Sequence, residues 1–146
     1  MRGEVGRQVG MLTVVQPEHR IPADHPIRRI KALADGQLRE LSPVFERMYA
    51  DRGRPSIPPE RLLKACLLIA LYTVRSERQF CEQLDYNLLF RWFLDMSADE
   101  PTFDASSFSR NRDRLLDHDV AAKFFAAVVG TKTRPAFLVV DDHERS

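Results

Sequence analysis

The segment from residue 59 to residue 74, PERLLKACLLIALYTV, is apolar around most of its helical circumference. A helix with a single apolar stripe can lie at a surface, whereas a helix that is apolar on nearly all sides must be covered by other elements. Pro58 and Pro59 favour a helix start here, because a residue in the first turn needs no backbone N–H donor. We therefore predict a helix over 59–74 that lies at the centre of a helical fold.

The residues before this helix predict an arm and two further helices. Residues 1–24 contain several Gly and Pro residues without a sustained helical period, which indicates a flexible N-terminal arm. Apolar residues then recur at helical spacing over 25–41. Ser42-Pro43 is typical of an N-cap followed by a first-turn proline, so we predict a second helix start there. The loop DRGRPSIPPE, residues 51–60, separates this helix from the central one.

Start and stop signals divide the second half of the chain into short helices. Ser76 and Gln79 form a capping box, in which side chains satisfy backbone N–H groups of the first turn. Asp104 can cap a later helix in a similar way. We therefore predict a helix from Ser76, a turn at 85–87, and helices over 88–95, 104–116 and 119–129, the last ending at Gly130.

These patterns together predict an all-α fold, a compact multi-helix domain that contains a helix-turn-helix-like module. We divide the chain into the arm (1–24), a helical domain (25–130), and a linker with the start of a further domain (131–146). Within the last segment, AFLVV at 136–140 has the composition of a short C-terminal strand remnant.

Charge is nearly balanced over the chain as a whole. The 22 basic residues comprise 18 Arg and four Lys, against 21 acidic residues, and the formal net charge is +1. Such a chain lacks a long-range basic field, so contact with nucleic acid requires local clustering. The N-terminal residues do not resemble a secretory signal, and the most apolar run is too short to cross a bilayer. We expect a cytoplasmic protein with no membrane partner.

The strongest local cluster lies in FDASSFSRNRDRLL, residues 103–116. On a helical wheel centred on buried Phe108, the side chains of Ser106, Ser107, Arg110 and Arg114 fall on the outward side. Small polar residues in a first turn, followed by Arg one turn later, are typical of a helix that enters a DNA major groove. We therefore predict that these four residues bind DNA.

The alternative is an ordinary solvated helix face. Arg110 can pair with Asp113 three residues later, and Arg112 lies nearer the apolar flank, where it can pair with an acid. The helices that precede this one, with a capped short helix, a turn and Trp92, have the layout of a helix-turn-helix module, which favours the DNA-binding interpretation.

Three further basic residues are predicted to widen the DNA-binding surface. Arg52 and Arg54 lie in the proline-rich loop, where they can contact the DNA backbone or belong to a rigid connector. Lys64 follows on the central helix, together with Arg61. Arg91 is a second-choice contact, since it is expected to be exposed between apolar neighbours.

Other reactive side chains receive structural interpretations. Trp92 and Phe93 can stack on bases, but so apolar a helix favours the core for both. Cys66 and Cys81 lie in apolar helical patterns, which predicts core packing without a disulfide or a zinc site. His25 is expected to cap or turn the chain. We predict no catalytic residue and no metal ligand.

Four strings, HPIRRIKAL, MYADRGRPSIPPERLLKACLL, VRSERQFCEQLDYNLLFRWFLDM and FDASSFSRNRDRLL, resemble the N-terminal domain of bacterial insertion-sequence transposases of the IS-five-like group. The resemblance runs from about residue 15 to residue 129, and RGRPSIPPE and LDYNLLFRWF are its most specific parts. It implies a helical domain that helps to recognise terminal inverted repeats. In this family the helical domain precedes an RNase-H-like domain, whose Asp, Asp and Glu bind a divalent metal such as Mg²⁺ and carry out strand transfer.

The resemblance also implies that this chain is truncated before the catalytic domain. Asp141 and Asp142 resemble the stretch that precedes the first catalytic Asp of the family, and adjacent strand residues point to opposite faces. We therefore expect a DNA-binding, nucleoid-associated bacterial protein with no cofactor and no enzyme activity of its own. The alternative is a helical module that dimerises or that inhibits full-length transposase by binding it.

Overall fold

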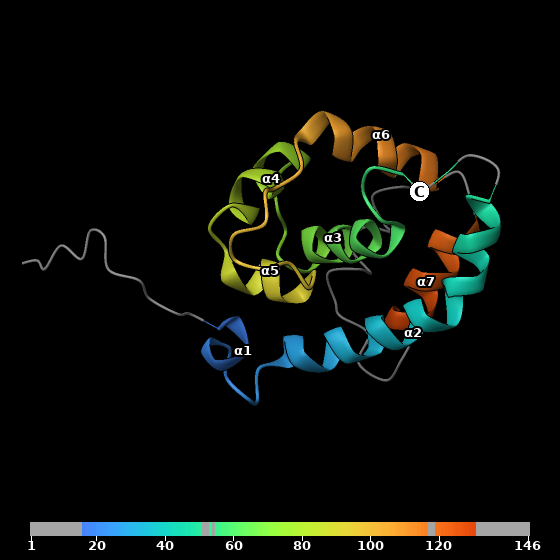
Figure 1. The fold of residues 1–146 in the computed structure, drawn as a ribbon. Helices are drawn as coiled ribbons and strands as arrows, with labels where there is room; N and C mark the ends of the chain where they lie inside the picture. Colours follow the sequence, from blue (N-terminus) through green and yellow to red (C-terminus); the bar gives the residue numbers. More distant parts are fainter. Residues whose placement is uncertain (1–15, 51–52, 54, 117–118, 131–146) are drawn as a thin grey trace, which may run out of the picture.

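The computed structural model describes residues 16–50, 53, 55–116 and 119–130, and these residues form an all-α fold without a strand. The strand predicted at 136–140, the two aspartates at 141 and 142, and residues 1–15 of the predicted arm lie outside the described residues. Figure 1 shows the described helices, which are α1 (Pro17–Arg20), α2 (Pro26–Met48), α3 (Pro59–Leu71), α4 (Glu77–Leu84), α5 (Leu88–Phe93), α6 (Ala105–Leu116) and α7 (Asp119–Val129).

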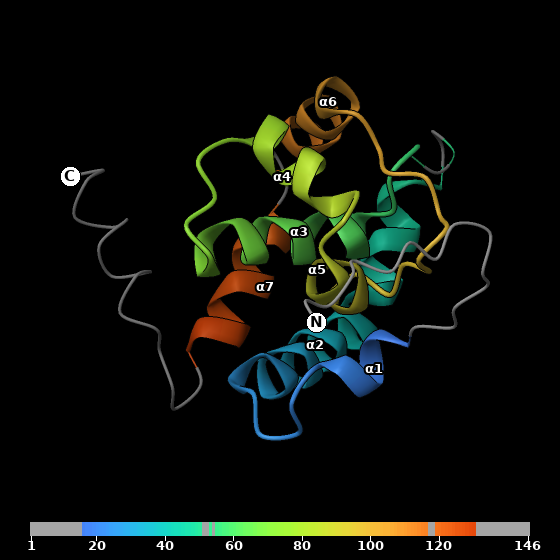
Figure 2. The same ribbon diagram turned by 90° about the vertical axis from the view of Figure 1, so that its left-hand side faces the viewer.

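Helix α3 lies at the centre of the fold, as its all-round apolar pattern predicts. The views in Figures 1 and 2 agree in placing it between α2 on one side and α6 on the other, and it also packs against α7. Its side chains Leu62, Leu63, Leu67 and Leu68 are almost completely buried. Burying a leucine side chain contributes about 1.5–3 kcal/mol, so this helix supplies much of the driving force for folding.

The central helix ends at Leu71, three residues earlier than its sequence pattern predicts. Thr73 has a left-handed backbone conformation, with φ of 51°, and its N–H donates to the carbonyl oxygen of Ala70 at 3.4 Å. The N–H of Val74 donates to the carbonyl oxygen of Ile69 at 3.0 Å. This pattern closes a helix end and normally uses glycine, so a β-branched residue at this position is strained.

The end of α5 has the same arrangement. Asp95 has φ of 57°, its N–H donates to Trp92 O at 3.2 Å, and the N–H of Met96 donates to Arg91 O at 2.8 Å. The helix predicted over 88–95 therefore ends at Phe93. Aspartate tolerates the left-handed region better than most residues do, and here the turn directs its carboxylate towards two lysines.

The prediction of a helix break at Ser42-Pro43 is wrong, because α2 continues through both residues to Met48. An internal proline removes one backbone hydrogen bond and costs about 3 kcal/mol. Leu38 and Phe45 lie two turns apart on the same face of α2, and both are buried. The packing of α2 along α7 therefore outweighs the local signal for a new helix start at Ser42-Pro43.

The caps predicted at Ser76 and His25 are confirmed, and Asn87, which was predicted only as part of a turn, also caps a helix. Ser76 Oγ accepts a hydrogen bond from the Gln79 N–H at 3.1 Å, and the Asn87 side chain accepts one from the Phe90 N–H at 3.1 Å. His25 caps α2, since its Nδ1 accepts from the Ile27 N–H at 3.0 Å. These local bonds satisfy N–H groups that a helix start leaves without partners.

Buried aromatic rings join α4, α5 and α6. The ring of Phe80 lies 5.3 Å from that of Phe90 and 5.9 Å from that of Phe108, measured between centroids. All three side chains are almost fully buried. Each aromatic pair of this kind adds about 0.5–1.5 kcal/mol beyond the contribution of the area it buries. These pairs therefore hold α6 against α4 and α5.

Part of the segment for which we expected an arm is folded. Residues 17–20 form helix α1, and Ile21 is buried. Glu18 pairs with Arg28 of α2 and accepts a hydrogen bond from Trp92 Nε1 of α5 at 2.9 Å. These polar contacts therefore hold α1 against α2 and α5. The periodicity of apolar residues does not predict them.

Candidate nucleic-acid interface

Helix α6 lies along one edge of the molecule, on the opposite side of α3 from α2 (Figures 1 and 2). Its inner face is set by Phe108 and Leu115, which are buried, and by Asn111, whose Nδ2 donates to Ser107 O at 2.7 Å and to Ser56 Oγ at 3.1 Å. The helical wheel predicted this inner face from Phe108 and Leu115. The exposed residues of α6 are Ser106, Arg110, Asp113, Arg114 and Leu116.

Asp104 caps α6, as predicted. Hydrogen bonds from the Ser107 and Ser106 side chains and from backbone N–H groups hold the pKa of this carboxyl group below its ordinary value. The Ser106 hydroxyl lies 2.7 Å from the Asp104 carboxylate. The first turn of α6 therefore already has an anionic partner, which competes with a phosphate for the same donors.

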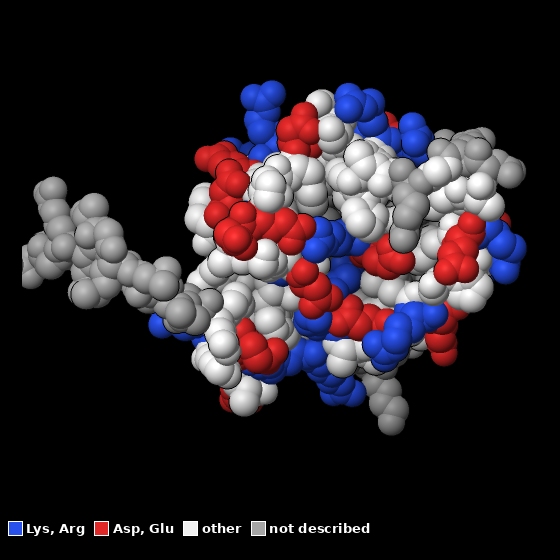
Figure 3. Space-filling view, viewed as in Figure 1, with Lys and Arg blue, Asp and Glu red and all other residues white. Residues whose placement is uncertain are grey.

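Arg110 and Arg114 are exposed on the outer side of α6. Arg110 Nη2 donates to Ser107 Oγ at 3.3 Å, and neither arginine forms an ion pair with another described residue. Lys and Arg side chains stand along the edge of the molecule over α6 in Figure 3. The two guanidinium groups are thus one helical turn apart on an accessible edge.

Arg112 has the opposite orientation, as its place near the apolar flank predicts. Its guanidinium pairs with Glu77 of α4 and lies 2.9 Å from Asp113, while its buried Nε has no partner among the described residues. Ser109 also donates to Glu77. Asp113 therefore pairs with Arg112 and not with Arg110, and Glu77 fastens α6 to the start of α4.

The structure does not support Lys64 as a DNA contact. Its side chain is buried, with only 2% of its surface exposed, and its Nζ lies 2.6 Å from Asp35 and 3.1 Å from Asp95. Arg61, its neighbour, pairs with Glu100 and donates to two backbone carbonyl groups. Both cations belong to a mixed charged group that joins α2, α3 and the end of α5. Arg52 and Arg54 lie outside the described residues.

Arg91 is buried, so the expectation that it is exposed is wrong. Its guanidinium donates to four oxygen atoms, and the side chain keeps 4% of its surface exposed. Phe93 is fully buried, which confirms its place in the core. Trp92 is half-buried beneath cations, with Arg28 5.2 Å and Lys31 5.4 Å from its ring centroid. These contacts occupy the ring face that a base would need.

Sequence reasoning missed the importance of Glu77. The residue stands at the first position of α4, where an acid is ordinarily explained by the helix dipole. Its partners Ser109 and Arg112 follow more than 30 residues later, so a local pattern gives no signal of the contact. Through these two contacts Glu77 holds one side of α6 against α4, while Arg110 and Arg114 remain exposed.

The remaining candidate chemistry is sparse in the described part of the chain. Cys66 and Cys81 are both free, and burial raises the pKa of each thiol to about 11, which leaves them protonated at neutral pH. No cluster of three potential metal ligands occurs within residues 16–50, 53, 55–116 and 119–130. Over the same residues, none of the helices has the length and apolar character needed to cross a membrane.

The fold and the site together define an all-α domain that presents two arginines from an edge helix. Residues 15–114 match the family model described as Transposase domain (DUF772). Because the match covers more than half of the 146 residues, the chain belongs to this transposase domain family. The matched region extends from just before α1 to Arg114 on α6. No curated protein and no solved structure matches the chain.

Proposed function

We propose that this transposase-family chain binds the terminal inverted repeats of an insertion-sequence element through the outer side of α6. The observation that carries the proposal is the exposure of Arg110 and Arg114, one turn apart, without an ion pair among the described residues. The family gives the setting, since a transposase must recognise DNA. In this proposal α4, α5 and α6 form the helix-turn-helix-like module, and the element is of the IS-five-like group.

The dimensions of α6 suit the major groove. Its 12 residues span about 18 Å, and an α-helix fits a groove that is about 12 Å wide. A guanidinium group can donate two hydrogen bonds to a guanine edge or to a phosphate. Asp104 and Asp113 flank the arginines and weaken attraction to an arbitrary polyanion. This mixture of charges favours recognition of a particular site over general attraction to DNA.

The proposal assigns DNA binding, and no strand transfer, to the described residues. Phosphoryl transfer of this kind uses two metal ions about 4 Å apart, held by several carboxylates. The resemblance places that chemistry, with its Mg²⁺, in an RNase-H-like domain that follows the helical domain in the family. The role of this chain in transposition would then be to position the ends of the element.

The test measures affinity for a labelled duplex that carries the terminal repeat of the element surrounding the gene, by fluorescence anisotropy at several salt concentrations. Replacing Arg110 or Arg114 by alanine should weaken binding and reduce the salt slope by about one, because fewer counterions are released. Arg29→Ala is the matched control, since Arg29 is exposed on α2, on the opposite side of the molecule. An unchanged salt slope for both α6 variants would contradict the proposal.

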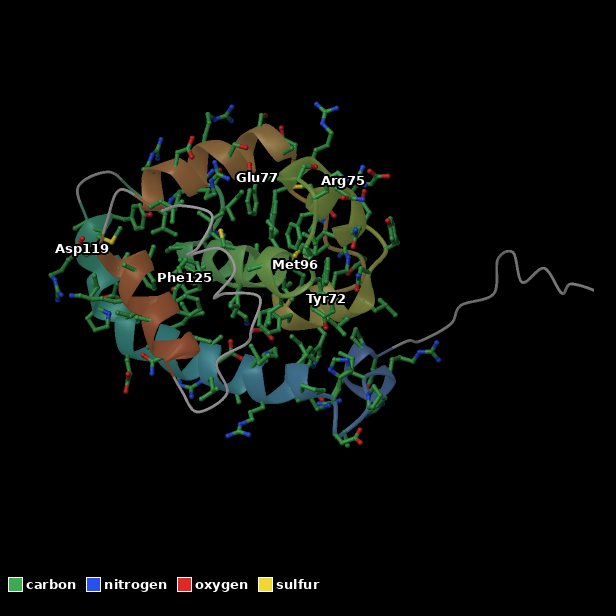
Figure 4. All side chains as sticks on the ribbon, turned by 180° about the vertical axis from the view of Figure 1, so that it is seen from behind. Tyr72, Arg75, Glu77, Met96, Asp119 and Phe125 are labelled. Atoms are coloured by element: carbon green, nitrogen blue, oxygen red, sulfur yellow. The ribbon has the colours of Figure 1, made fainter. Side chains whose placement is uncertain are left out.

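A second candidate function is association with another copy of the chain or with full-length transposase. Leu116 at the end of α6 is 48% exposed, and Phe125, labelled on α7 in Figure 4, is only partly buried. An exposed and a partly buried apolar side chain on two neighbouring helices favour a helical partner. Size-exclusion chromatography with light scattering should then give a mass above 16.8 kDa. A monomer that does not co-purify with transposase would contradict this candidate.

A further inference from the structure

A pocket of about 420 Å³ lies between the turn after α3, the outer side of α4 and the start of α5. Sites for small molecules commonly enclose about 300–1,000 Å³, so this volume is sufficient for a nucleobase. Tyr72, Arg75, Gln79, Gln83 and Asn87 contribute to its lining. We infer that this pocket binds an unpaired nucleobase, one that is single-stranded or extruded from a duplex. The inference rests on the proposed DNA-binding function and adds a second site to it.

The aromatic wall of the pocket is held in place and remains accessible. Tyr72 is 41% exposed, and its ring lies 5.5 Å from the ring of Phe90, at 60° to it. Phe90 is buried in the core, so it supports the tyrosine ring from one side. An exposed aromatic face held in this way is a stacking surface for a base, because every base has a π face.

Amide side chains form the opposite part of the lining. Gln79 Oε1 accepts a hydrogen bond from the Arg75 N–H at 3.3 Å, and Asn87 Oδ1 accepts from the Phe90 N–H at 3.1 Å. These bonds fix both carbonyl oxygens and leave the two NH₂ groups as donors. Gln83, one turn after Gln79, has no side-chain hydrogen bond to another described residue and offers both a donor and an acceptor. Amides in this arrangement can pair with the hydrogen-bonding edge of an unstacked base.

The position of the pocket links it to the proposed duplex surface. Arg75 is exposed at its rim, where its guanidinium can contact the phosphate of the bound nucleotide. Glu77, two residues later, binds Ser109 and Arg112 of α6. Figure 4 shows Arg75 and Glu77 at the level where α4 approaches α6, and Tyr72 farther from α6, beside α5. The rim of the pocket at Arg75 is therefore the part of the lining that lies towards α6.

The lining favours a nucleobase over a peptide. Peptide-binding grooves depend on an exposed strand edge or on a largely apolar trough. This pocket has a mixed lining, in which three amides, an arginine and an exposed tyrosine accompany the apolar side chains Val74, Leu89 and Phe90. Thr73, which also lines the pocket, has the strained left-handed conformation described above. Strain of this kind persists where the surrounding structure needs a particular backbone shape, and here it lies in the turn that closes α3 directly after Tyr72.

The experiment uses the full chain and two labelled duplexes of the same sequence. One is fully paired, and the other carries a single 2-aminopurine opposite an abasic site, whose fluorescence reports stacking. We expect tighter binding of the second duplex, with a change in 2-aminopurine fluorescence. Tyr72→Leu should weaken this binding roughly 5- to 150-fold, the range for loss of one base–aromatic stack, and should leave the paired duplex within about twofold. Tyr72→Phe should retain the preference.

The matched control for the aromatic ring is Tyr86→Leu, because Tyr86 is 67% exposed and does not line the pocket. Gln83→Ala provides a second variant that leaves the core intact, and it should also reduce the preference for the unpaired base. Circular dichroism checks that each variant folds. If Tyr72→Leu fails to fold, the effect of Gln83→Ala on the preference for the unpaired base tests the pocket assignment instead.

The outcomes separate this inference from the proposed function. Equal affinity for both duplexes, with binding that depends on Arg110, would overturn the pocket assignment and leave DNA binding by α6 standing. A preference for the unpaired base that survives both Tyr72→Leu and Gln83→Ala would also overturn it. Binding of neither duplex would overturn both, and binding of a peptide library alone would make the pocket a peptide site.

Discussion

Cations in two regions of this molecule have opposite surroundings. In the interior, Lys64 and Arg91 are buried and surrounded by oxygen atoms. Along α6, Arg110 and Arg114 are exposed and form no ion pair with a described residue. All four occur on helices and look alike in the sequence. Whether a basic side chain is structural or exposed therefore depends on the acids and carbonyl groups that lie near it in the fold. These groups come from elements that are distant in the sequence.

Arg91 gives the most complete case of an interior cation. Its guanidinium donates to the carbonyl oxygens of Leu84 at 2.7 Å, Ser97 at 2.7 Å and Glu100 at 2.8 Å, and to the hydroxyl of Thr102 at 3.1 Å. The loop between α5 and α6 is therefore organised around one side chain, because its carbonyl groups have a common donor.

The largest expected effect is that of Arg91→Ala, which should lower the free energy of unfolding by about 3–5 kcal/mol. The variant leaves several carbonyl oxygens without a donor and also leaves a cavity. Urea denaturation measures the loss. Arg91→Lys should also destabilise the protein, because an ammonium group cannot reach the same four oxygen atoms. If either variant retained the stability of the original chain, the interior assignment of Arg91 would fail.

A smaller loss, of about 2–3 kcal/mol, is expected for Lys64→Ala. The variant leaves Asp35 and Asp95 without their buried partner, but Asp95 is 65% exposed at its side chain and Lys31 still lies 3.0 Å from it, so water and Lys31 reduce the effect. Thermal unfolding compares this variant with Lys123→Ala, whose side chain is exposed on α7. A loss no greater than that of the control would remove Lys64 from the interior group.

The interior charges also predict a dependence of stability on pH. Burial alone would raise the pKa of Asp95, but hydrogen bonds from Lys31 and Lys64 outweigh it and lower the pKa. A lowered pKa gives stability that is present above the unfolded value, about 3.9, and is lost as the pH falls through the folded value. Asp95→Asn should therefore flatten the loss below about pH 5, by less than about 1 kcal/mol because the group is largely exposed. If the free energy of unfolding fell equally with decreasing pH in the original chain and in Asp95→Asn, the pairing of Asp95 with Lys31 and Lys64 would be contradicted.

The smallest effect on stability is expected on the α6 edge. The double variant Arg110→Ala with Arg114→Ala should change the free energy of unfolding by less than about 0.5 kcal/mol, since neither side chain is buried or ion-paired to a described residue. The double variant and Arg91→Ala should therefore give the smallest and the largest loss of stability among these variants. A loss of several kcal/mol would mean that these arginines have structural partners.

Local signals in the sequence predicted the framework well. The central place of α3 follows from its all-round apolar pattern, and Ser76, Asp104 and His25 were identified as caps because a cap acts within a few residues. Gly130 ends α7, as predicted, since a Cβ at this position would lie 2.5 Å from the Ala126 carbonyl oxygen. The outer face of α6 followed from one buried residue, Phe108, and the helical period.

The sequence could not predict properties that depend on distant partners. Lys64 was expected on the DNA-binding surface because its acids, Asp35 and Asp95, lie about 30 residues away in each direction. Arg91 was expected to be exposed because three of its four acceptors are backbone carbonyl groups, which have no sequence signature. Pro43 marks a helix start by local rules, and only the packing of α2 on α7 overrides it.

That packing has a consequence for how the chain is made. Helix α2 finds its most extensive neighbour in α7, the last described helix, which leaves the ribosome long after α2 does. At a synthesis rate of about 5–20 residues per second, the apolar side of α2 waits several seconds for its cover. The nascent chain is therefore most vulnerable to aggregation and to proteases during that interval, and a chain released before Asp119 is added would be unable to complete this core.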